Sequence, residues 1–335
     1  MQKKENKKPP LIIIAGPTAV GKSAAAVALA KRIGGEIVSA DSMQVYRGMD
    51  IGTAKVTEEE MGGVPHHLID VISPEEDYHV VRFQKMAESA VKEILARGRI
   101  PIICGGTGFY IQALLYDIEF AGDPPDAEEK KKHMEQFLQK AREADERRKR
   151  GEAGESGADL LHRQLASVDP ESADAIPAAN EKRVIRALEF YELYGKKISE
   201  HNREQTERKR SSPYDFRFFV LTDERNRLYQ RIDARVDRMF SEGLMEEVER
   251  LLKQGVNPSG TAMQGIGYKE AAEALRGSCT EEEARETIKR NSRHYAKRQL
   301  TWFRREGSVI WIDIGKTPDV LSEMLSHLPG AWIPG

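Results

Sequence analysis

The segment GPTAVGKS, residues 16–23, constrains the fold of this chain more than any other feature. It directly follows the apolar run LIIIA and precedes an alanine-rich stretch that favours helix. Its spacing, G-x-x-x-x-G-K-[ST], is that of a phosphate-binding loop. A short, continuously apolar run before such a loop is typical of a strand buried on both faces of a parallel sheet. The segment therefore predicts a strand, a phosphate loop and a helix in that order.

Each residue type in this loop has a role in holding an anion. Gly16 and Gly21 let the backbone fold around the anion, with the loop amides and the helix N-terminus directed at it. Lys22 supplies a positive charge, and the Ser23 hydroxyl can bind Mg²⁺. The structural alternative is a glycine-rich strand-to-helix turn with no ligand. The predicted diphosphate-binding residues are Gly16, Pro17, Thr18, Ala19, Val20, Gly21, Lys22 and Ser23.

Strand-like and helix-like segments alternate along most of the chain, which predicts an α/β fold. We expect a P-loop NTPase-like parallel sheet flanked by helices. From about residue 122 to 194 the chain is charged and helical without a convincing strand, so an inserted all-helical subdomain is expected there. The predicted divisions are a tail over 1–10, core over 11–120, helical insertion over 121–200, core with a basic helix over 201–320, and a C-terminal tail over 321–335.

Composition excludes several classes of protein. Of 335 residues, 39% are hydrophobic and 32% charged, and no apolar run reaches the ~20 residues that cross a bilayer. Two cysteines, Cys104 and Cys279, argue against a disulfide scaffold or a multi-cysteine zinc site. These features favour a cytoplasmic protein with no membrane contact, and no obligate protein partner is evident.

Basic residues are concentrated in one stretch although the net charge is only −2. From Lys289 to Arg305 there are seven Lys or Arg and no acid. Such a strip can bind nucleic acid on one face of the molecule, or it can be an ordinary solvated helix face. Composition alone does not decide between the two.

A carboxylate follows the second predicted strand. The apolar segment IPIICGGT ends without an acid, whereas EIVSAD ends in Asp41. A carboxylate at that place can take a hydrogen bond or a proton from an attacking group. The pair therefore suggests a group-transfer enzyme with a diphosphate donor and a separate acceptor. The structural alternative is that Asp41 caps a helix or a turn.

Five ordered motifs carry a resemblance to a known family. GPTAVGKS is followed by DSMQVYRGMDIGTAK (41–55), GGTGFY (105–110), GIGYKE (265–270) and AKRQLTWFR (296–304). Together they resemble bacterial tRNA dimethylallyltransferases, the IPP transferase family, which prenylate N6 of an adenosine next to the anticodon, at position 37 of tRNA. The resemblance covers about residues 10 to 315. Ser292 stands where the family often has threonine, and both carry a hydroxyl.

The resemblance implies a donor and the residues that act on it. The loop would hold the diphosphate of dimethylallyl diphosphate, with Mg²⁺ on Ser23. Asp41 would orient the N6 amine and take its proton. Thr18 would hydrogen-bond the bridging oxygen of the donor, and Arg225 would grip the diphosphate. Asp41, Thr18 and Arg225 are thus the catalytic residues that the resemblance implies.

The resemblance also implies a large acceptor, the anticodon stem-loop of tRNA. A base in that loop must leave its stack to reach a pocket, at a cost that contacts to neighbouring nucleotides must offset. The basic helix and the helical insertion would supply some of those contacts. The predicted tRNA-binding residues are Asp41, Ser42, Met43, Gln44, Thr107, Arg183, Arg186, Arg290 and Lys297.

Two other functions stay open at this point. One is prenyl transfer to a free adenine nucleotide, against which the large insertion and the basic helix argue. The other is a P-loop kinase or a nucleotide-dependent RNA-binding protein, against which the missing acid after IPIICGGT argues. The pair His66–His67 has no partner spacing that supports a metal site and is interpreted as structural.

Overall fold

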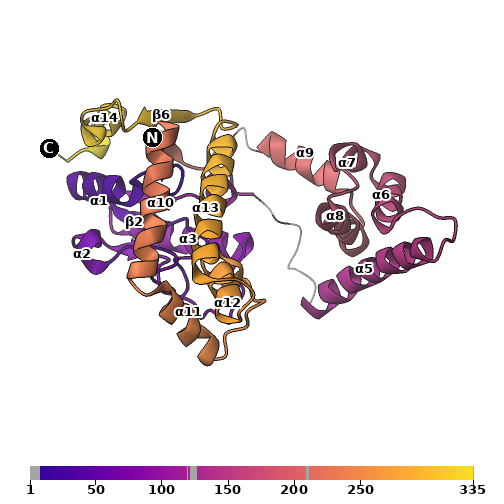
Figure 1. Ribbon diagram of the computed structural model, residues 1–335. Coiled ribbons are helices and arrows are strands. Elements are labelled where there is room, and N and C mark those ends of the chain that lie inside the picture. Colours follow the sequence, from indigo (N-terminus) through magenta and orange to yellow (C-terminus); the bar gives the residue numbers. More distant parts are fainter. Residues whose placement is uncertain (1–7, 119, 121–126, 209–210, 335) are drawn as a thin grey trace, which may run out of the picture. The chain divides into compact units, whose positions relative to one another are not determined.

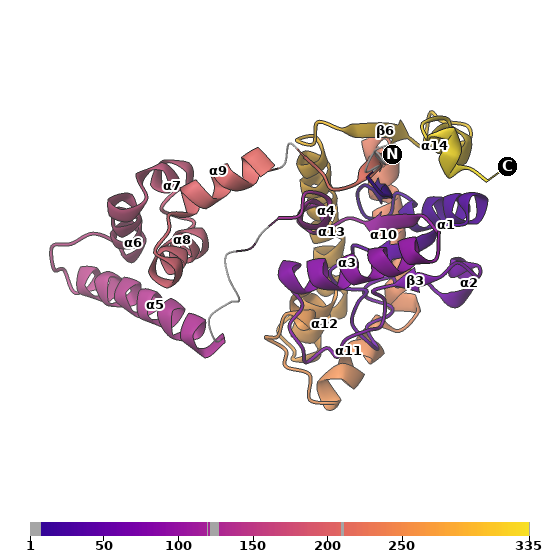
Figure 2. The ribbon, with the colours of Figure 1, turned by 180° about the vertical axis from the view of Figure 1, so that it is seen from behind.

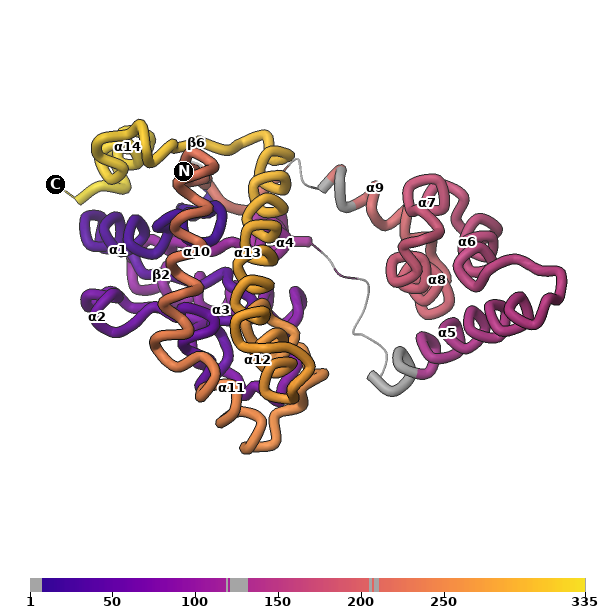
Figure 3. Tube along the Cα trace, viewed as in Figure 1, coloured from indigo at the N-terminus to yellow at the C-terminus, as the bar shows by residue number. Residues whose placement is uncertain are grey.

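The computed structural model describes residues 8–118, 120, 127–208 and 211–334 (Figure 3). The chain forms two compact units, and each is considered by itself. The first comprises Met1–Asp117 with Ser212–Gly335, and the second comprises Ile118–Ser211. The first unit is therefore built from both ends of the chain.

The first unit contains a six-stranded sheet in the order β3-β2-β4-β1-β5-β6, in which every pair of neighbours is parallel. The predicted α/β fold, a parallel sheet flanked by helices, is confirmed. The strand β1 lies between β4 and β5, which come from opposite sides of the insertion. The strands are β1 (Pro10–Ala15), β2 (Glu36–Ser39), β3 (His66–His67), β4 (Pro101–Gly105), β5 (Asp215–Thr222) and β6 (Val309–Asp313).

Both faces of the sheet are buried, which explains the continuous apolar run in β1. Leu11 and Ile13 join one core cluster and Ile12 and Ile14 join another, because successive side chains of a strand point to opposite faces. Figures 1 and 2 show the helices of the two layers from opposite sides. The first cluster includes residues of α3 (Val80–Ala96), α4 (Gly108–Leu115), α11 (Leu244–Lys253) and α12 (Tyr268–Leu275); the second includes residues of α1 (Lys22–Ile33), α10 (Arg225–Ser241) and α14 (Val320–Ser326).

The helix α13 (Glu281–Phe303) contributes to both clusters. It runs beside α10 in Figure 1, and two ion pairs join these helices. Lys289 Nζ lies 2.8 Å from an oxygen of Asp237, and Arg293 Nη1 lies 2.5 Å from an oxygen of Asp233. Part of the basic strip predicted for nucleic acid is therefore used within the fold.

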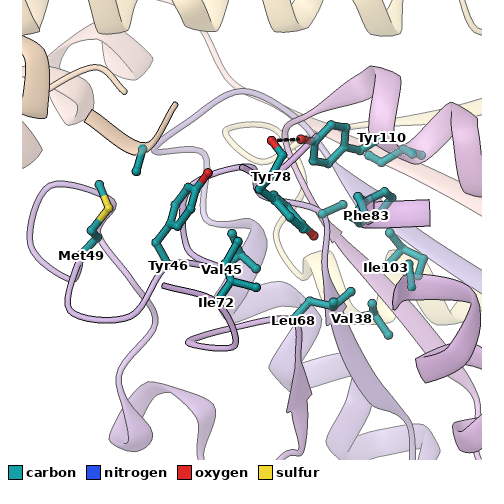
Figure 4. Close-up of a cluster of buried hydrophobic side chains, with 14 of the residues drawn as sticks. Val38, Val45, Tyr46, Met49, Leu68, Ile72, Tyr78, Phe83, Ile103 and Tyr110 are labelled. Carbon is teal, nitrogen blue, oxygen red and sulfur yellow. Dashed lines mark hydrogen bonds between the residues drawn. The ribbon is translucent and has the colours of Figure 1, made fainter. Parts of the chain in front are cut away.

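An aromatic cluster fixes the segment that follows β2 (Figure 4). The rings of Tyr46 and Tyr78 meet edge-on with centroids 6.4 Å apart, and those of Tyr78 and Tyr110 do so at 5.8 Å. Phe83 stacks on Tyr110 at 4.7 Å. Such contacts stabilise beyond the area they bury, so the residues just after Asp41 have a rigid support.

The second unit has its own apolar core. Among the described residues of this unit, every regular element is a helix: α5 (Ala127–Lys149), α6 (Gly157–Val168), α7 (Pro170–Ala175), α8 (Glu181–Tyr194) and α9 (Ile198–Arg208). The core includes Phe137, Leu161 and Val184. The helix α9 crosses the boundary expected at residue 200, because the buried Asp169 carboxylate accepts a hydrogen bond from the Ser199 amide at 3.0 Å. The helical unit thus extends to Ser211.

The C-terminal segment is packed rather than a tail. The expectation of a tail over residues 321–335 is wrong, because α14 places Met324 fully inside the core cluster that also holds Phe219 of β5. Trp332 follows α14 in the chain, and the guanidinium carbon of Arg217 lies over its ring, 5.3 Å from the ring centroid. The C-terminal segment therefore belongs to the core of the first unit.

Candidate active site

A cavity opens at the carboxyl ends of β1, β2 and β4, with an empty volume of about 670 Å³. That volume includes space open to solvent. In open α/β sheets, ligands bind at the carboxyl ends of the parallel strands. The cavity is lined by Thr18, Lys22, Ser23, Ile37, Ser39, Asp41, Gln44, Thr53, Val56, His66, Ile69, Cys104, Gly105, Gly106, Arg235, Tyr295 and Gln299.

The phosphate-loop segment adopts a conformation that depends on its glycines. Gly16 has φ 144° and Gly21 has φ 93°, both in the region that favours glycine. A Cβ on Gly16 would also lie 2.4 Å from the carbonyl oxygen of Leu221 on β5. The helix α1 begins at Lys22, so its N-terminus faces the cavity end of the loop. Pro17, Ala19 and Val20 form the body of the loop without lining the cavity.

Lys22 lies at the centre of this loop. Its Nζ donates a hydrogen bond to the carbonyl oxygen of Pro17 at 2.7 Å. Burial lowers the pKa of Lys22 to about 8, and the nearby Arg235 cation acts in the same direction, while Cys104 and Asp41 oppose the shift. An anion bound in the loop would restore the preference of Lys22 for its charged form, since an opposite charge nearby favours ionisation.

Asp41 faces the same cavity from the end of β2. Its Oδ1 accepts hydrogen bonds from the amides of Met43 at 2.8 Å and Gln44 at 3.3 Å. Within the described part of the chain, no donor reaches Oδ2. The turn role and the functional role proposed for Asp41 are therefore compatible, because one oxygen shapes the turn and the other is left for a ligand.

Two glycines separate Asp41 from the phosphate loop. The strand β4 lies between β1 and β2 and ends at Gly105–Gly106. A Cβ on Gly105 would lie 2.3 Å from the Ala40 carbonyl oxygen, and one on Gly106 would lie 2.1 Å from Nε2 of Gln299. The absence of side chains here brings the acid and the phosphate loop to one cavity.

Gln299 of α13 joins the phosphate loop to the segment that follows β4. The Thr18 amide donates to Gln299 Oε1 at 2.9 Å, and Gln299 Nε2 donates to the Gly106 carbonyl at 2.9 Å. Tyr295, one turn earlier, also lines the cavity, and burial raises its pKa to about 12. Thr107 stands at the N-terminus of α4 and does not line the cavity. Sequence reasoning missed both Gln299 and Tyr295, although Gln299 lies in the quoted motif AKRQLTWFR.

The arginine at this cavity is Arg235, not Arg225. Arg225 begins α10, is exposed, and stacks over Tyr229 at 5.1 Å; it is not among the lining residues. Arg235 lies farther along the same helix, and its Nη1 donates to Thr18 Oγ1 at 3.1 Å. Its Nη2 donates to the carbonyl oxygen of Ala54 at 3.3 Å. The role in gripping a diphosphate, assigned to Arg225 by resemblance, is thus better matched by Arg235.

The segment after Asp41 contributes further polar groups. Gln44 lines the cavity, and its Nε2 donates to the carbonyl oxygens of Ala54 at 3.1 Å and Thr53 at 3.4 Å. The amide nitrogen is therefore used by the protein. Met43 is partly buried against the first core cluster, and Ser42 is half-buried beside it.

His66 also lines the cavity, a place that the sequence analysis did not assign to it. It lies on β3, and its Nδ1 is 2.8 Å from the carbonyl oxygen of Val64. Burial lowers the pKa of His66. A neutral ring that donates through Nδ1 leaves Nε2 as an acceptor. A two-residue strand gives too little pattern for the sequence to place this side chain.

The remaining predicted tRNA-binding residues lie on the exposed faces of two helices. Arg183 and Arg186 are exposed on α8 of the helical unit, and Arg290 and Lys297 are exposed on α13. Lys297 belongs to a second hollow, which we call the outer groove. It is lined by His294, Lys297, Arg298, Thr301, Trp302 and Arg305.

The cavity offers oxygen donors that suit Mg²⁺. Ser23 and Asp41 both line it, and Mg²⁺ in phosphate-binding sites is held by few protein oxygens together with substrate phosphates and water. Over residues 8–118, 120, 127–208 and 211–334, no three His, Cys, Asp or Glu side chains gather as a metal site of their own. None of the helices in those residues is long and apolar enough to cross a membrane.

Comparisons with known proteins agree with this geometry. The IPP transferase family model matches residues 44–306, and the isopentenyl transferase model matches residues 9–75. The tRNA dimethylallyltransferase of Lachnoclostridium phytofermentans is 48% identical, over 95% of this chain and 97% of its own. That of Geobacillus thermodenitrificans is 50% identical, over 91% of this chain and 90% of its own.

Solved structures are similar along the same length. The tRNA isopentenylpyrophosphate transferase of Bacillus halodurans is 43% identical with a TM-score of 0.67, covering 96% of this chain and 94% of its own. A eukaryotic dimethylallyltransferase, solved acting on tRNA, is 29% identical with a TM-score of 0.76, covering 95% of this chain and 77% of its own. The phosphate loop, the carboxylate after β2 and these similarities together identify the chain as a member of the IPP transferase family.

Proposed function

We propose that this protein transfers the dimethylallyl group of dimethylallyl diphosphate to N6 of the adenosine at position 37 of tRNA, and releases diphosphate. The observation that carries the proposal is the single cavity into which a phosphate loop and the carboxylate of Asp41 both open. One end of that cavity suits a leaving diphosphate, and the other suits an amine nucleophile. Membership in the IPP transferase family supports the same reaction.

The donor end would stabilise the charge that develops as the allylic C1–O bond breaks. Negative charge grows on the departing diphosphate while positive charge spreads over the allyl group. Lys22, Arg235 and the amides at the start of α1 surround the loop, so they would stabilise the transition state more than the ground state. Mg²⁺ bound at Ser23 would add further positive charge beside the diphosphate.

The acceptor end would hold the exocyclic amine. Its lone pair is delocalised into the adenine ring, so it is a poor nucleophile that needs orientation. Asp41 Oδ2 would accept a hydrogen bond from N6–H while N6 bonds to C1, and would take the N6 proton as the new bond completes. The carbonyl of Gln44 would remain available to a neighbouring base, because its amide nitrogen is used by Thr53 and Ala54.

The anticodon stem-loop would contact exposed cations outside the cavity. The outer groove on α13 combines Lys297, Arg298 and Arg305 with the ring of Trp302. Neutralisation of phosphates and stacking of unpaired bases are the usual terms in such binding. Arg290 on α13 and Arg183 and Arg186 on α8 would add phosphate contacts.

A P-loop kinase would need an acid for its metal at the end of a strand that neighbours β1, and β4 ends in glycine. Asp223 follows β5, the other neighbour of β1, but its carboxylate accepts from Arg227 Nε at 2.9 Å and does not line the cavity. This favours prenyl transfer over nucleotide hydrolysis.

An acceptor competition tests the proposal. The protein is mixed with Mg²⁺, labelled dimethylallyl diphosphate, and an unmodified anticodon stem-loop RNA, the same RNA with guanosine at position 37, or AMP. Label is expected in the first RNA only. Label in AMP alone would select the free-nucleotide reaction, and phosphate release from ATP without prenyl transfer would select the kinase class.

A further inference from the structure

A buried carboxylate that does not line the cavity fixes the loop that forms part of the cavity wall. Glu247 of α11 is only 2% exposed. Its Oε2 accepts from the amides of Asp50 at 2.9 Å and Ile51 at 3.0 Å, and its Oε1 accepts from the Gly52 amide at 3.1 Å. The fourth hydrogen-bond donor is the Tyr268 hydroxyl, which donates to Oε1 at 2.6 Å. We call residues 50–54 the wall loop.

The backbone of the wall loop is strained, so contacts with the rest of the protein must hold it in this conformation. Ala54 has φ 45°, which an alanine rarely adopts. A Cβ on Gly52 would lie 2.5 Å from the Tyr268 ring, so the ring covers the loop directly. Burial and the Glu247 charge both raise the pKa of Tyr268, which keeps its hydroxyl a hydrogen-bond donor. Three backbone amides and one phenol thus fix the loop to α11 and α12.

The far end of the wall loop holds two residues of the cavity. The Ala54 carbonyl accepts from both Arg235 Nη2 and Gln44 Nε2. Arg235 in turn donates to Thr18 Oγ1 in the phosphate loop. Glu247 therefore connects to the phosphate loop through the backbone of the wall loop and the hydrogen bonds at its two ends, all within the first unit.

We infer that Glu247 is a positioning residue for the transfer reaction, acting through the wall loop on Arg235 and Gln44. The inference rests on the proposed function for the identity of the reaction. A carboxylate is needed because it only accepts hydrogen bonds. Glutamine at the same place would turn an NH₂ group toward two of the four donors. The wall loop would then shift, and the Ala54 carbonyl would move away from Arg235.

A double-mutant cycle distinguishes positioning from plain stability. The variants are Glu247→Gln, Arg235→Ala and the double variant, with single-turnover transfer to the stem-loop RNA at saturating donor. Glu247→Gln is expected to slow transfer roughly 10- to 100-fold, the scale of a ~1 Å misplacement at a reacting centre. The double variant should be no more than about threefold slower than Arg235→Ala alone, because groups that act through one another are not additive. A double variant slowed by the product of the two single effects, or a normal rate in Glu247→Gln, would overturn the inference.

A matched control is the other buried glutamate of this region. Glu270 is 6% exposed and accepts from the Gly267 amide at 2.9 Å and from Asn291 at 2.7 Å, and these partners do not line the cavity. Glu270→Gln should lower the melting temperature without slowing transfer by more than about twofold, as expected for a residue that stabilises the fold without contacting the cavity. If Glu247→Gln does not fold, Tyr268→Phe removes one hydrogen bond and is expected to slow transfer about three- to tenfold, within the range for one lost hydrogen bond. A normal rate in Tyr268→Phe would then count against the inference.

Binding of inorganic diphosphate with Mg²⁺, measured by calorimetry, separates this inference from the proposed function. If wild type transfers to no acceptor, the proposed function fails, but the same cycle can be read in diphosphate affinity. Glu247→Gln and Arg235→Ala should weaken that affinity non-additively. Additive losses of diphosphate affinity, or no loss in Glu247→Gln, would rule out the positioning role whatever the reaction is.

Discussion

The guanidinium of Arg235 and the hydroxyl of Thr18 are joined by a hydrogen bond of 3.1 Å. This contact ties the middle of α10 to the loop after β1, across the greater part of the sequence. It places a cation beside the loop that Lys22 already makes positive. The proposed donor site is therefore built from both halves of the chain.

Arg235→Ala should slow transfer by roughly two to three orders of magnitude, the range for removing one preorganised group that stabilises transition-state charge. Arg225→Ala should change the rate by less than about threefold, as expected for a surface substitution. Single-turnover transfer of labelled dimethylallyl to the stem-loop RNA measures both. The reverse order of effects would restore the assignment made by resemblance.

Asp41→Asn should slow transfer by about 10²- to 10⁴-fold, the usual contribution of a general base. Asparagine retains an oxygen for the amides of Met43 and Gln44, so the turn should survive. Circular dichroism and donor affinity serve as controls and should match wild type. A rate within a few-fold of wild type would show that Asp41 takes no proton.

Diphosphate affinity should fall as the pH rises above about 8. The pKa of Lys22 is lowered to about 8 in the free protein, so the ammonium that attracts the anion is lost above that pH. Below it the charge is fully present and affinity should level off with respect to this group. Calorimetric titration with diphosphate between pH 7 and 9.5 measures the effect, with the ~tenfold loss per pH unit that one proton implies. Lys22→Ala should bind weakly and lack this pH dependence; the same dependence in that variant would assign it elsewhere.

Lys297→Ala should weaken binding of the stem-loop RNA and reduce the slope of log affinity against log salt by about one, as expected when one phosphate contact is lost. Lys289→Ala is the matched control on the same helix, because Lys289 is paired with Asp237 of α10. Fluorescence anisotropy over a range of salt concentrations measures both. Equal slopes for the two variants would remove the outer groove from the RNA interface.

The sequence predicted those parts of the fold that have strong local patterns. The apolar run of β1 and the glycine spacing of the phosphate loop each specify local structure by themselves. Asp41, which the sequence shows after the second strand, lines the same cavity as the loop because the carboxyl ends of parallel strands share one edge of a sheet.

The missed residues depend on tertiary packing instead. Arg225 and Arg235 lie on the same helix, and only the packing of α10 decides which one faces the cavity. Gln299 looks like an ordinary polar residue of a basic helix until its two hydrogen bonds are seen. The helix α14 is short, and its single fully buried side chain, Met324, gives too weak a pattern to separate it from a tail.

The pairing of β1 with β5 bears on how the protein is made. Ile12 is paired with Arg217, so the central strand keeps an open edge until the ribosome has passed the whole helical unit. That unit carries its own core and can fold as it emerges, whereas the sheet of the first unit must wait for β5. Nascent chains arrested before residue 215 should therefore hold a protease-resistant helical unit next to an unfinished, protease-sensitive N-terminal part, and catalytic competence should arrive only with the last third of translation.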